Sequence, residues 1–202
     1  MIENGIPLGK FAPDEAARSA VRDELGIPRD AIVVGSVGRL VEEKDYPLLV
    51  RAMAPLLGAR VRLVIVGEGI VRAAIEAAIT PAIRDFVTLT GARRDVARVL
   101  SAFDVYASSS RAEGLPLALA EAMASRLPIV ATAVGGVPDI VPEQIGVLVP
   151  HGDPPALRTA IQRFIDDSAA RVSMGEAARR YALGRFAEER MLDRYLALYA
   201  VR

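Results

Sequence analysis

Cysteine is absent from the 202 residues of this sequence, and histidine occurs only once. Without cysteine the chain can form neither a disulfide nor a thiolate metal site, and it has no cysteine nucleophile. The single histidine, His151, lies in the Pro- and Gly-rich run VLVPHGDPPAL. One histidine without a local cluster argues against a histidine metal site, so we expect His151 to be a solvated loop residue.

An excess of charge of either sign is also lacking, because 25 Lys and Arg residues balance 25 Asp and Glu residues. The balance indicates neither a nucleic acid nor an anionic membrane as a partner. Long hydrophobic runs are missing as well: they extend over about four to eight residues, whereas a membrane span needs roughly 18. The first residues, MIENGIPLGKFAP, show no signal peptide. We therefore expect a soluble, cytoplasmic protein.

Short apolar runs alternate with segments of helical pattern along the chain. This alternation predicts an α/β fold: a Rossmann-like, doubly wound parallel sheet of about six strands, followed by C-terminal helices. The predicted strands are Ile32–Gly38, Val61–Val66, Phe86–Thr90, Phe103–Ala107, Ile129–Thr132 and Gly146–Val149. Helices are predicted over 14–25, 47–57, a segment ending near Thr80, 95–102, 154–166, 169–183 and 186–199.

The stretch from Ser108 to Val130, SSSRAEGLPLALAEAMASRLPIV, combines hydroxyls, a glycine turn, two acids and an apolar helix. If the helix starts at Leu115 or Pro116, the N–H groups of Gly114 and Leu115 favour an anion such as phosphate. Eight residues of helix advance about 12 Å, so Glu113 and Glu121 are able to contact different parts of one extended ligand. A nucleoside diphosphate sugar has that layout. The alternative is a favourable acid at the helix start and an incidental buried Glu121.

Two basic residues follow the first predicted strand, in the run GRLVEEK. Arg39 and Lys44 would lie at the carboxyl end of that strand, where open α/β sheets bind ligands. The alternative is a surface loop with two scattered bases. A dinucleotide fingerprint is not present, because Arg72 stands where the third glycine of G-x-G-x-x-G belongs, after Gly67 and Gly69.

Taken together, SSSRAEGLPLALAEAMASRLPIVATAVGG, GRL-x-x-x-K and the opening ENGIPLGKFAP resemble glycosyltransferase family 4, a retaining family with the GT-B fold. The opening segment is similar to the family's NG-[IV]-D-x-x-x-F-x-P, with Pro7 where Asp is common, and Asp45 stands where Gly is frequent. The resemblance implies that the chain is the C-terminal half of a GT-B enzyme. Residues 1–13 would be the remnant of the interdomain linker, 14–184 the donor-binding domain and 185–202 the closing helix.

The resemblance also implies a role for each candidate site residue. Arg39 and Lys44 would neutralise the donor diphosphate together with the helix start, Glu113 would hydrogen-bond the transferred sugar, and Glu121 would bind the ribose hydroxyls. Arg39, Lys44 and Glu113 are the expected catalytic residues. The full predicted donor site consists of Gly38, Arg39, Lys44, Gly67, Gly91, Arg93, Glu113, Gly114, Leu115, Leu117 and Glu121. No cofactor and no obligatory metal are implied, because basic residues take the place of the ion.

The function that follows is transfer of a sugar from a nucleoside diphosphate to an acceptor hydroxyl, with retention of configuration, once an absent N-terminal acceptor domain is supplied. The chain alone is expected to be inactive. One alternative is a nucleotide-binding module without catalysis, and another is a sugar-nucleotide epimerase with the GT-B fold. The final helix would expose Phe186, Met191, Leu192, Tyr195 and Leu198 if that domain is missing, and it offers a surface for self-association.

Overall fold

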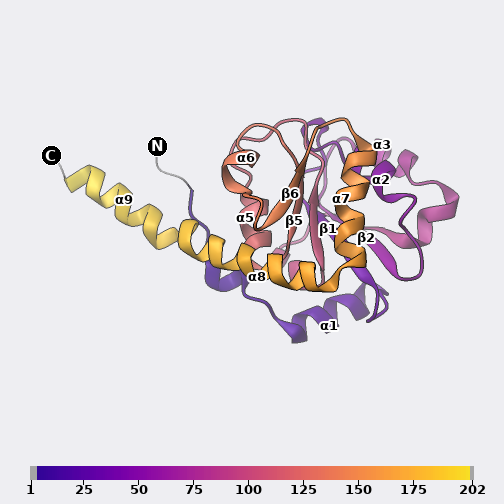
Figure 1. The fold of residues 1–202 in the computed structure, drawn as a ribbon, viewed down its shortest axis with the longest axis horizontal. Coiled ribbons are helices and arrows are strands. Elements are labelled where there is room, and N and C mark those ends of the chain that lie inside the picture. The colour runs from indigo at the N-terminus through magenta and orange to yellow at the C-terminus, as the bar shows by residue number, and fades with distance from the viewer. Residues whose placement is uncertain (1–3, 201–202) are drawn as a thin grey trace.

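A computed structural model describes residues 4–200 of the chain (Figure 1). Within these residues six strands form one parallel sheet with the order β3-β2-β1-β4-β5-β6. Their bounds are β1 (Ile32–Val37), β2 (Val61–Val66), β3 (Val87–Leu89), β4 (Val105–Ser108), β5 (Ile129–Thr132) and β6 (Gly146–Val149). The predicted α/β, Rossmann-like sheet is therefore confirmed.

Helices cover both faces of the sheet. One face carries α1 (Glu15–Glu24), α4 (Val96–Ser101), α5 (Leu117–Ala124), α6 (Val137–Ile140) and α8 (Ser168–Arg185); the other carries α2 (Tyr46–Met53), α3 (Arg72–Ala78) and α7 (Pro154–Asp166). Successive residues of β1 serve opposite faces: Val33 packs into the first core and Val34 into the second. This double coverage is the reason why the strands are continuous apolar runs without alternation.

Aspartate side chains begin four of the described helices, and three of these caps share one geometry. The Oδ1 atoms of Asp14, Asp153 and Asp167 each accept a hydrogen bond of 2.9 Å from the backbone N–H three residues later. Each bond satisfies one of the free donors in the first turn. The predicted helix starts at Asp14 and at Asp153-Pro154 are confirmed.

A buried cation joins α1 to the sheet, which the sequence did not indicate. Arg22 is 2% exposed and donates to Asp104 Oδ2 at 2.7 Å, to Ala102 O at 3.1 Å and to Ala31 O at 2.9 Å. Asp104 in turn accepts from the backbone N–H of Val33 at 2.7 Å. The pair therefore connects α1 to the segments that enter β1 and β4.

The connection between β2 and β3 differs from the prediction. The helix predicted to end near Thr80 corresponds to α3, which ends at Ala78, but an unpredicted 3-10 helix, η3 (Pro81–Phe86), follows it, and β3 has three residues where a strand over Phe86–Thr90 was predicted. Pro81 explains the break, because a proline removes one backbone donor and forces the preceding residue out of the helical region. Thr80 has φ −68° and ψ 160°, which is extended backbone.

The segment predicted as a linker remnant packs into the core as far as it is described. It contains a 3-10 helix, η1 (Leu8–Phe11), and the exposed fractions of Ile6 and Phe11 are 3% and 7%. The N–H of Ile6 donates to Phe186 O at 2.8 Å. Residues 1–3 of the predicted linker and residues 201–202 of the predicted closing helix lie outside the described residues.

The last helix, α9 (Glu188–Ala200), extends away from the body of the molecule (Figure 1). Its exposed apolar residues are Leu192, Tyr195, Leu196, Leu198 and Tyr199. Two residues of the predicted stripe do not belong to it. Phe186 is 1% exposed because it packs in the core, and the sulfur of Met191 accepts a hydrogen bond from the Gly5 N–H at 3.2 Å.

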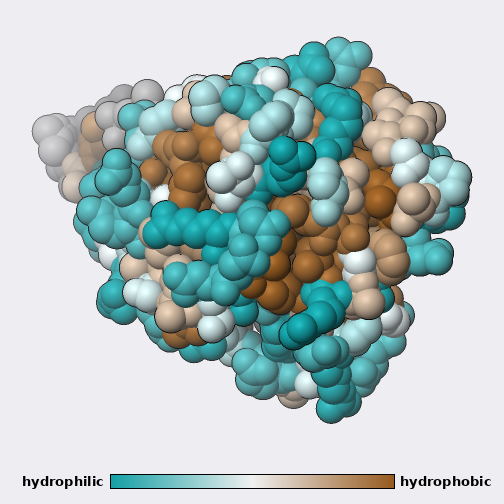
Figure 2. All heavy atoms as spheres, turned by 45° about the vertical axis from the view of Figure 1, so that its right-hand side comes forward, coloured by the Kyte–Doolittle hydropathy of each residue, from teal (hydrophilic) through white to brown (hydrophobic). Residues whose placement is uncertain are grey.

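The surface in Figure 2 is mixed: hydrophilic residues surround an area in which hydrophobic ones reach the surface. Among the helices of residues 4–200, none is both long and apolar enough to span a bilayer.

Candidate functional site

The site begins where the strand order reverses, between β1 and β4. These strands pair only at Val34 with Val105 and at Gly35 with Tyr106. Beyond that point the Tyr106 hydroxyl stands between them, accepting from Val37 N at 3.3 Å and donating to Val37 O at 3.0 Å. The strands separate at their carboxyl ends, and such a switch point is where open α/β sheets hold ligands.

A cleft of about 640 Å³ opens beside this point. It lies between the loop after β1, which includes the 3-10 helix η2 (Glu42–Lys44), and the loop after β4. Its lining residues are Arg39, Val41, Glu42, Glu43, Lys44, Ile70, Ala112, Glu113 and Gly114. Four of the predicted site residues, Arg39, Lys44, Glu113 and Gly114, are thereby brought together.

Lys44 and Glu113 form an ion pair across the cleft. Lys44 Nζ lies 2.5 Å from Glu113 Oε1, and the two side chains are 23% and 9% exposed. The hydroxyl of Ser110 donates to the same oxygen at 2.6 Å. A ligand phosphate that binds Lys44 must therefore compete with the Glu113 carboxylate for the ammonium group.

The Arg39 guanidinium, by contrast, is exposed and has no hydrogen bond or ion pair to any residue that the structure describes. A guanidinium provides up to five N–H donors, and the donors of Arg39 have no protein acceptor within residues 4–200. This is the property expected of a cation that receives an anionic ligand.

The N-terminus of α5 supplies further donors. Pro116 precedes the first helical residue, and the N–H groups of Gly114 and Leu115 donate to no group in the described part of the chain. The loop after β5 holds this turn: Gly136 N donates to Glu113 O at 3.2 Å, and a Cβ on Gly135 would lie 1.8 Å from Glu113 O. Only a glycine at 135 allows that approach. Leu117 follows and is 37% exposed.

Glu121 lies one turn further along α5 and is half-buried. Its carboxylate has no hydrogen bond or ion pair among the described residues, and burial raises its pKa above the ordinary value for glutamate. Its charge acts on the neighbouring Tyr106 phenol beneath the cleft. A half-buried carboxylate without a protein partner has acceptor oxygens available to a ligand.

Three predicted glycines follow the adjacent strands β1, β2 and β3. The N–H of Gly67 donates to Gly91 O at 2.9 Å, and a Cβ on Gly67 would meet Gly38 O at 1.9 Å. The three strand ends therefore approach one another through backbone alone. Contact of Gly38, Gly67 and Gly91 with a ligand stays a prediction.

Arg93 is held elsewhere. Its guanidinium forms ion pairs with Glu24 and with Asp95, the latter at 2.8 Å, and its pKa is raised by the hydrogen bonds to both carboxylates. It is not among the residues that line the cleft. A role for Arg93 in donor binding stays a prediction, and it requires that one of these pairs opens.

Asp45 and its partners are the part of the site that the sequence did not reveal. Asp45 adopts a left-handed conformation, with φ 43° and ψ 47°, and is 5% exposed. Its carboxylate bonds Arg111 at 3.0 Å and His151 at 3.2 Å. His151 is thus an exposed loop residue, as predicted, but its imidazole is not simply solvated. The one signal in the sequence was an aspartate at a position where glycine is frequent.

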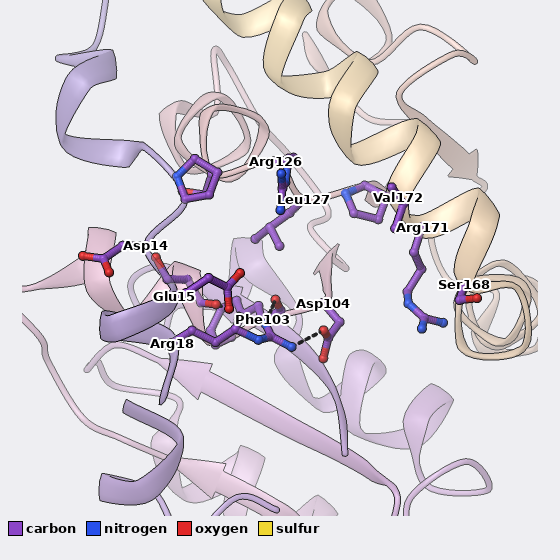
Figure 3. Close-up of a pocket in the computed structure, with 14 residues that line it drawn as sticks. Asp14, Glu15, Arg18, Phe103, Asp104, Arg126, Leu127, Ser168, Arg171 and Val172 are labelled. Carbon is purple, nitrogen blue, oxygen red and sulfur yellow. Dashed lines mark hydrogen bonds and ion pairs between the residues drawn. The ribbon is translucent and has the colours of Figure 1, made fainter. Parts of the chain in front are cut away.

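A second hollow, of about 320 Å³, lies at the amino ends of β4 and β5 (Figure 3). Its cations already have partners: Arg18 bonds Asp104 at 2.6 Å, and Arg171 donates to Ile165 O at 3.1 Å. Arg126 at its rim pairs with Glu176 at 3.1 Å. These side chains serve to hold the fold, and the hollow lacks the free donors that mark the cleft.

A family model described as "Glycosyl transferases group 1" matches residues 31–167. The D-inositol 3-phosphate glycosyltransferase of Segniliparus rotundus is 35% identical, over 98% of this chain and 46% of that protein. The GDP-mannose-dependent alpha-mannosyltransferase of Mycobacterium tuberculosis is 35% identical, over 90% of this chain and 46% of that protein. The chain spans about half the length of the curated relatives it matches.

Among solved structures, Anabaena Alr3699/HepE in complex with UDP superimposes with a TM-score of 0.92 at 24% sequence identity. The superposition covers 100% of this chain and 57% of that chain. At this identity the likeness concerns the fold.

Proposed function

The chain belongs to the glycosyl transferases group 1 family, and on that premise we propose that its cleft binds the diphosphate of a nucleoside diphosphate sugar. The observation that carries the proposal is the convergence of three kinds of donor in one cleft: the unpaired Arg39, the ammonium of Lys44, and the free N–H groups of Gly114 and Leu115. An anion with several oxygens is the ligand that such a group of donors favours.

In this proposal the donors also act on the reaction. As the glycosidic bond of the donor breaks, negative charge grows on the leaving diphosphate, and Arg39, Lys44 and the start of α5 stabilise it. Glu113 positions the transferred sugar, and Glu121 accepts hydrogen bonds from the ribose hydroxyls. We propose transfer with retention, as in family 4, and without an obligatory metal or cofactor. We propose neither Glu113 nor Glu121 as a covalent nucleophile, because the proposed phosphate-binding position lies between them.

Transfer requires an acceptor site, which we propose to lie in a second domain that packs against this one. The chain's coverage of about half of its relatives supports this proposal. The exposed apolar residues of α9 would contact that domain, or a second copy of the chain in its absence. The same coverage favours nucleotide binding without transfer as the function of this chain by itself. A sugar-nucleotide epimerase is a weaker candidate than either sugar transfer or nucleotide binding.

The test is a calorimetric titration of the chain with UDP, GDP and ADP, each with and without EDTA. We expect one diphosphate to bind preferentially, with the same affinity when metal is removed. Arg39→Ala should weaken binding about 10- to 100-fold, because a charge-assisted contact is lost. Arg29→Ala, at an exposed cation paired with Asp23 at 3.4 Å, is the matched control. Unchanged affinity in a folded Arg39→Ala variant contradicts the proposal.

A further inference from the structure

We propose that Asp45 is a positioning residue: it holds the loop after β1 against the loop after β4, so that Lys44 and Glu113 face each other before any ligand arrives. The inference rests on the proposed function, because it deepens the role of Lys44 in binding a diphosphate. It concerns a residue that touches no ligand in this scheme and acts through its neighbours.

The backbone conformation of Asp45 indicates that its side chain has a structural role. A left-handed conformation favours glycine, since a Cβ is strained there. Asp45 holds φ 43° and ψ 47° and carries a side chain that is almost wholly buried. Its Oδ1 accepts from the Leu48 N–H at 3.3 Å and so begins α2. Capping of α2 occupies one oxygen only and leaves Oδ2 for other partners.

Oδ2 joins residues from two further loops. It accepts from Arg111 Nε at 3.0 Å, in the loop after β4, and lies 3.2 Å from His151 Nε2, in the loop after β6. Burial of the carboxyl opposes ionisation, but the hydrogen bonds from Arg111 and His151 outweigh it and hold the pKa of Asp45 below its usual value. Asp45 is therefore an ionised acceptor shared by the ends of three strands.

Backbone contacts reinforce the same connection. The hydroxyl of Ser109 donates to the carbonyls of Lys44 and Asp45, at 2.9 Å each. The N–H of Arg111 donates to Glu43 O at 2.7 Å. Residues 43–45 and 109–111 are thus bonded to each other on both sides of Lys44, and Glu113 follows two residues later.

This connection limits the rearrangement that a ligand requires. Because the loops after β1 and β4 are already joined, a diphosphate can draw the Lys44 ammonium from Glu113 by moving the Lys44 side chain alone, with the backbone already in place. Pre-organisation of this kind raises affinity, since ordering has been completed before binding. Loss of the Asp45 carboxylate should therefore weaken binding through Lys44 and through no other donor.

The first test is a double-mutant cycle with the preferred nucleoside diphosphate. Asp45→Gly keeps the left-handed backbone and removes the carboxylate. We expect this change to lower the affinity about tenfold in the natural chain, but less than about twofold in the Lys44→Ala variant. Asp45→Asn, which keeps an acceptor, should recover part of the loss. Equal losses in both backgrounds would mean that Asp45 supports the fold in general, and would overturn the inference.

The second test needs no ligand and uses the scarcity of lysine. The sequence contains two lysines, Lys10 and Lys44, and Lys10 is exposed. Brief acylation with an amine-reactive ester, followed by peptide mass spectrometry, gives the reactivity of Lys44 relative to Lys10. We expect this ratio to rise at least about threefold in Asp45→Gly, because the pair with Glu113 loosens.

Asp167→Gly is the matched control for this test, because Asp167 caps α8 as Asp45 caps α2 but bonds neither Arg111 nor His151. Its ratio should stay at the natural value. An unchanged ratio in Asp45→Gly overturns the inference. A raised ratio in a chain that binds no diphosphate supports the positioning role and contradicts the proposed function, so the two failures are distinguishable.

Discussion

Arg39 and Glu121 differ from most charged side chains near the sheet, because neither has a protein partner within residues 4–200. At the opposite end of the sheet, Arg18, Arg22 and Asp104 satisfy one another. Leaving a polar group unpaired in a partly buried place costs free energy. Arg39 is exposed and carries little of this cost, but Glu121 is half-buried, and its cost supports the proposal that a ligand supplies the missing partner at the carboxyl ends of the strands.

Glu121→Gln should therefore stabilise the protein at neutral pH. Burial raises the pKa of Glu121 in the fold, so the contribution of the glutamate to stability is complete below its unfolded pKa and is lost as pH rises through the folded value. Glutamine carries no charge and escapes this loss. We expect a gain below about 1 kcal/mol in urea unfolding at pH 7, since the carboxylate keeps some contact with solvent.

The gain should vanish below about pH 4, where the glutamate is protonated too. The same variant should bind a nucleoside diphosphate more weakly than the natural chain. The difference in unfolding free energy between Glu121→Gln and the natural protein should be larger at pH 7 than at pH 4. The opposite order would contradict the assignment of Glu121 as a carboxylate without a compensating partner.

At the scale of elements, α1 and α5 end in the same way with different residues. In α1 the N–H of Ile27 donates to Arg22 O at 2.9 Å around Gly26, at φ 63°. In α5 the N–H of Leu127 donates to Ala122 O at 3.1 Å around Arg126, at φ 65°. Glycine is the usual residue at such a position, so α5 retains strain that α1 avoids.

Arg126→Gly should relieve that strain and raise the free energy of unfolding by about 1 kcal/mol, measured by urea denaturation. The lost pair with Glu176 is exposed and offsets little. Arg126→Ala is the control, because it removes the same pair and keeps the strained Cβ, and it should give no gain. Gly26→Ala should lose about 1 kcal/mol. Equal stability of the Gly and Ala variants at 126 would show that backbone conformation is not the cause.

The contact between α1 and the sheet depends on Arg22. Arg22→Met keeps much of the side-chain volume but leaves the carbonyls of Ala31 and Ala102 without this donor and weakens the pairing of Asp104. We expect a loss of about 3 to 5 kcal/mol in urea unfolding. Arg29→Ala breaks an ion pair whose side chains are 75% and 60% exposed, and should cost less than about 0.5 kcal/mol. Similar losses in both variants would contradict this account.

For the whole molecule, the two ends of the chain meet on the body at Ile6 and Phe186, before α9 departs from it. Phe186→Ala should therefore cost about 3 to 5 kcal/mol, as expected for a buried phenylalanine. Leu196→Ala, at a residue that is 67% exposed on α9, should change unfolding by less than about 0.5 kcal/mol. Thermal or urea unfolding checks both. A large loss at Leu196 would show that its exposed face is covered in solution.

Much of the fold could be predicted because both faces of the sheet are covered, which leaves apolar runs as long as the strands. The bounds of Val61–Val66, Ile129–Thr132 and Gly146–Val149 agree with the structure. The length of β3 was overestimated, because the 3-10 helix η3 extends through Phe86, where the strand was predicted to begin. Arg22 with Asp104 and Asp45 with His151 could not be predicted, because their partners lie 82 and 106 residues away in the sequence.

The Tyr106 hydroxyl that separates β1 from β4 has an optical consequence. Burial raises the pKa values of Tyr106 and Tyr46, both 2% exposed, well above that of a free phenol. The sequence holds five tyrosines and no tryptophan, so ultraviolet absorption by tyrosinate is not obscured. The two phenols beneath the cleft should absorb as tyrosinate only when the strands part, giving the protein a built-in spectroscopic indicator of the integrity of its switch point.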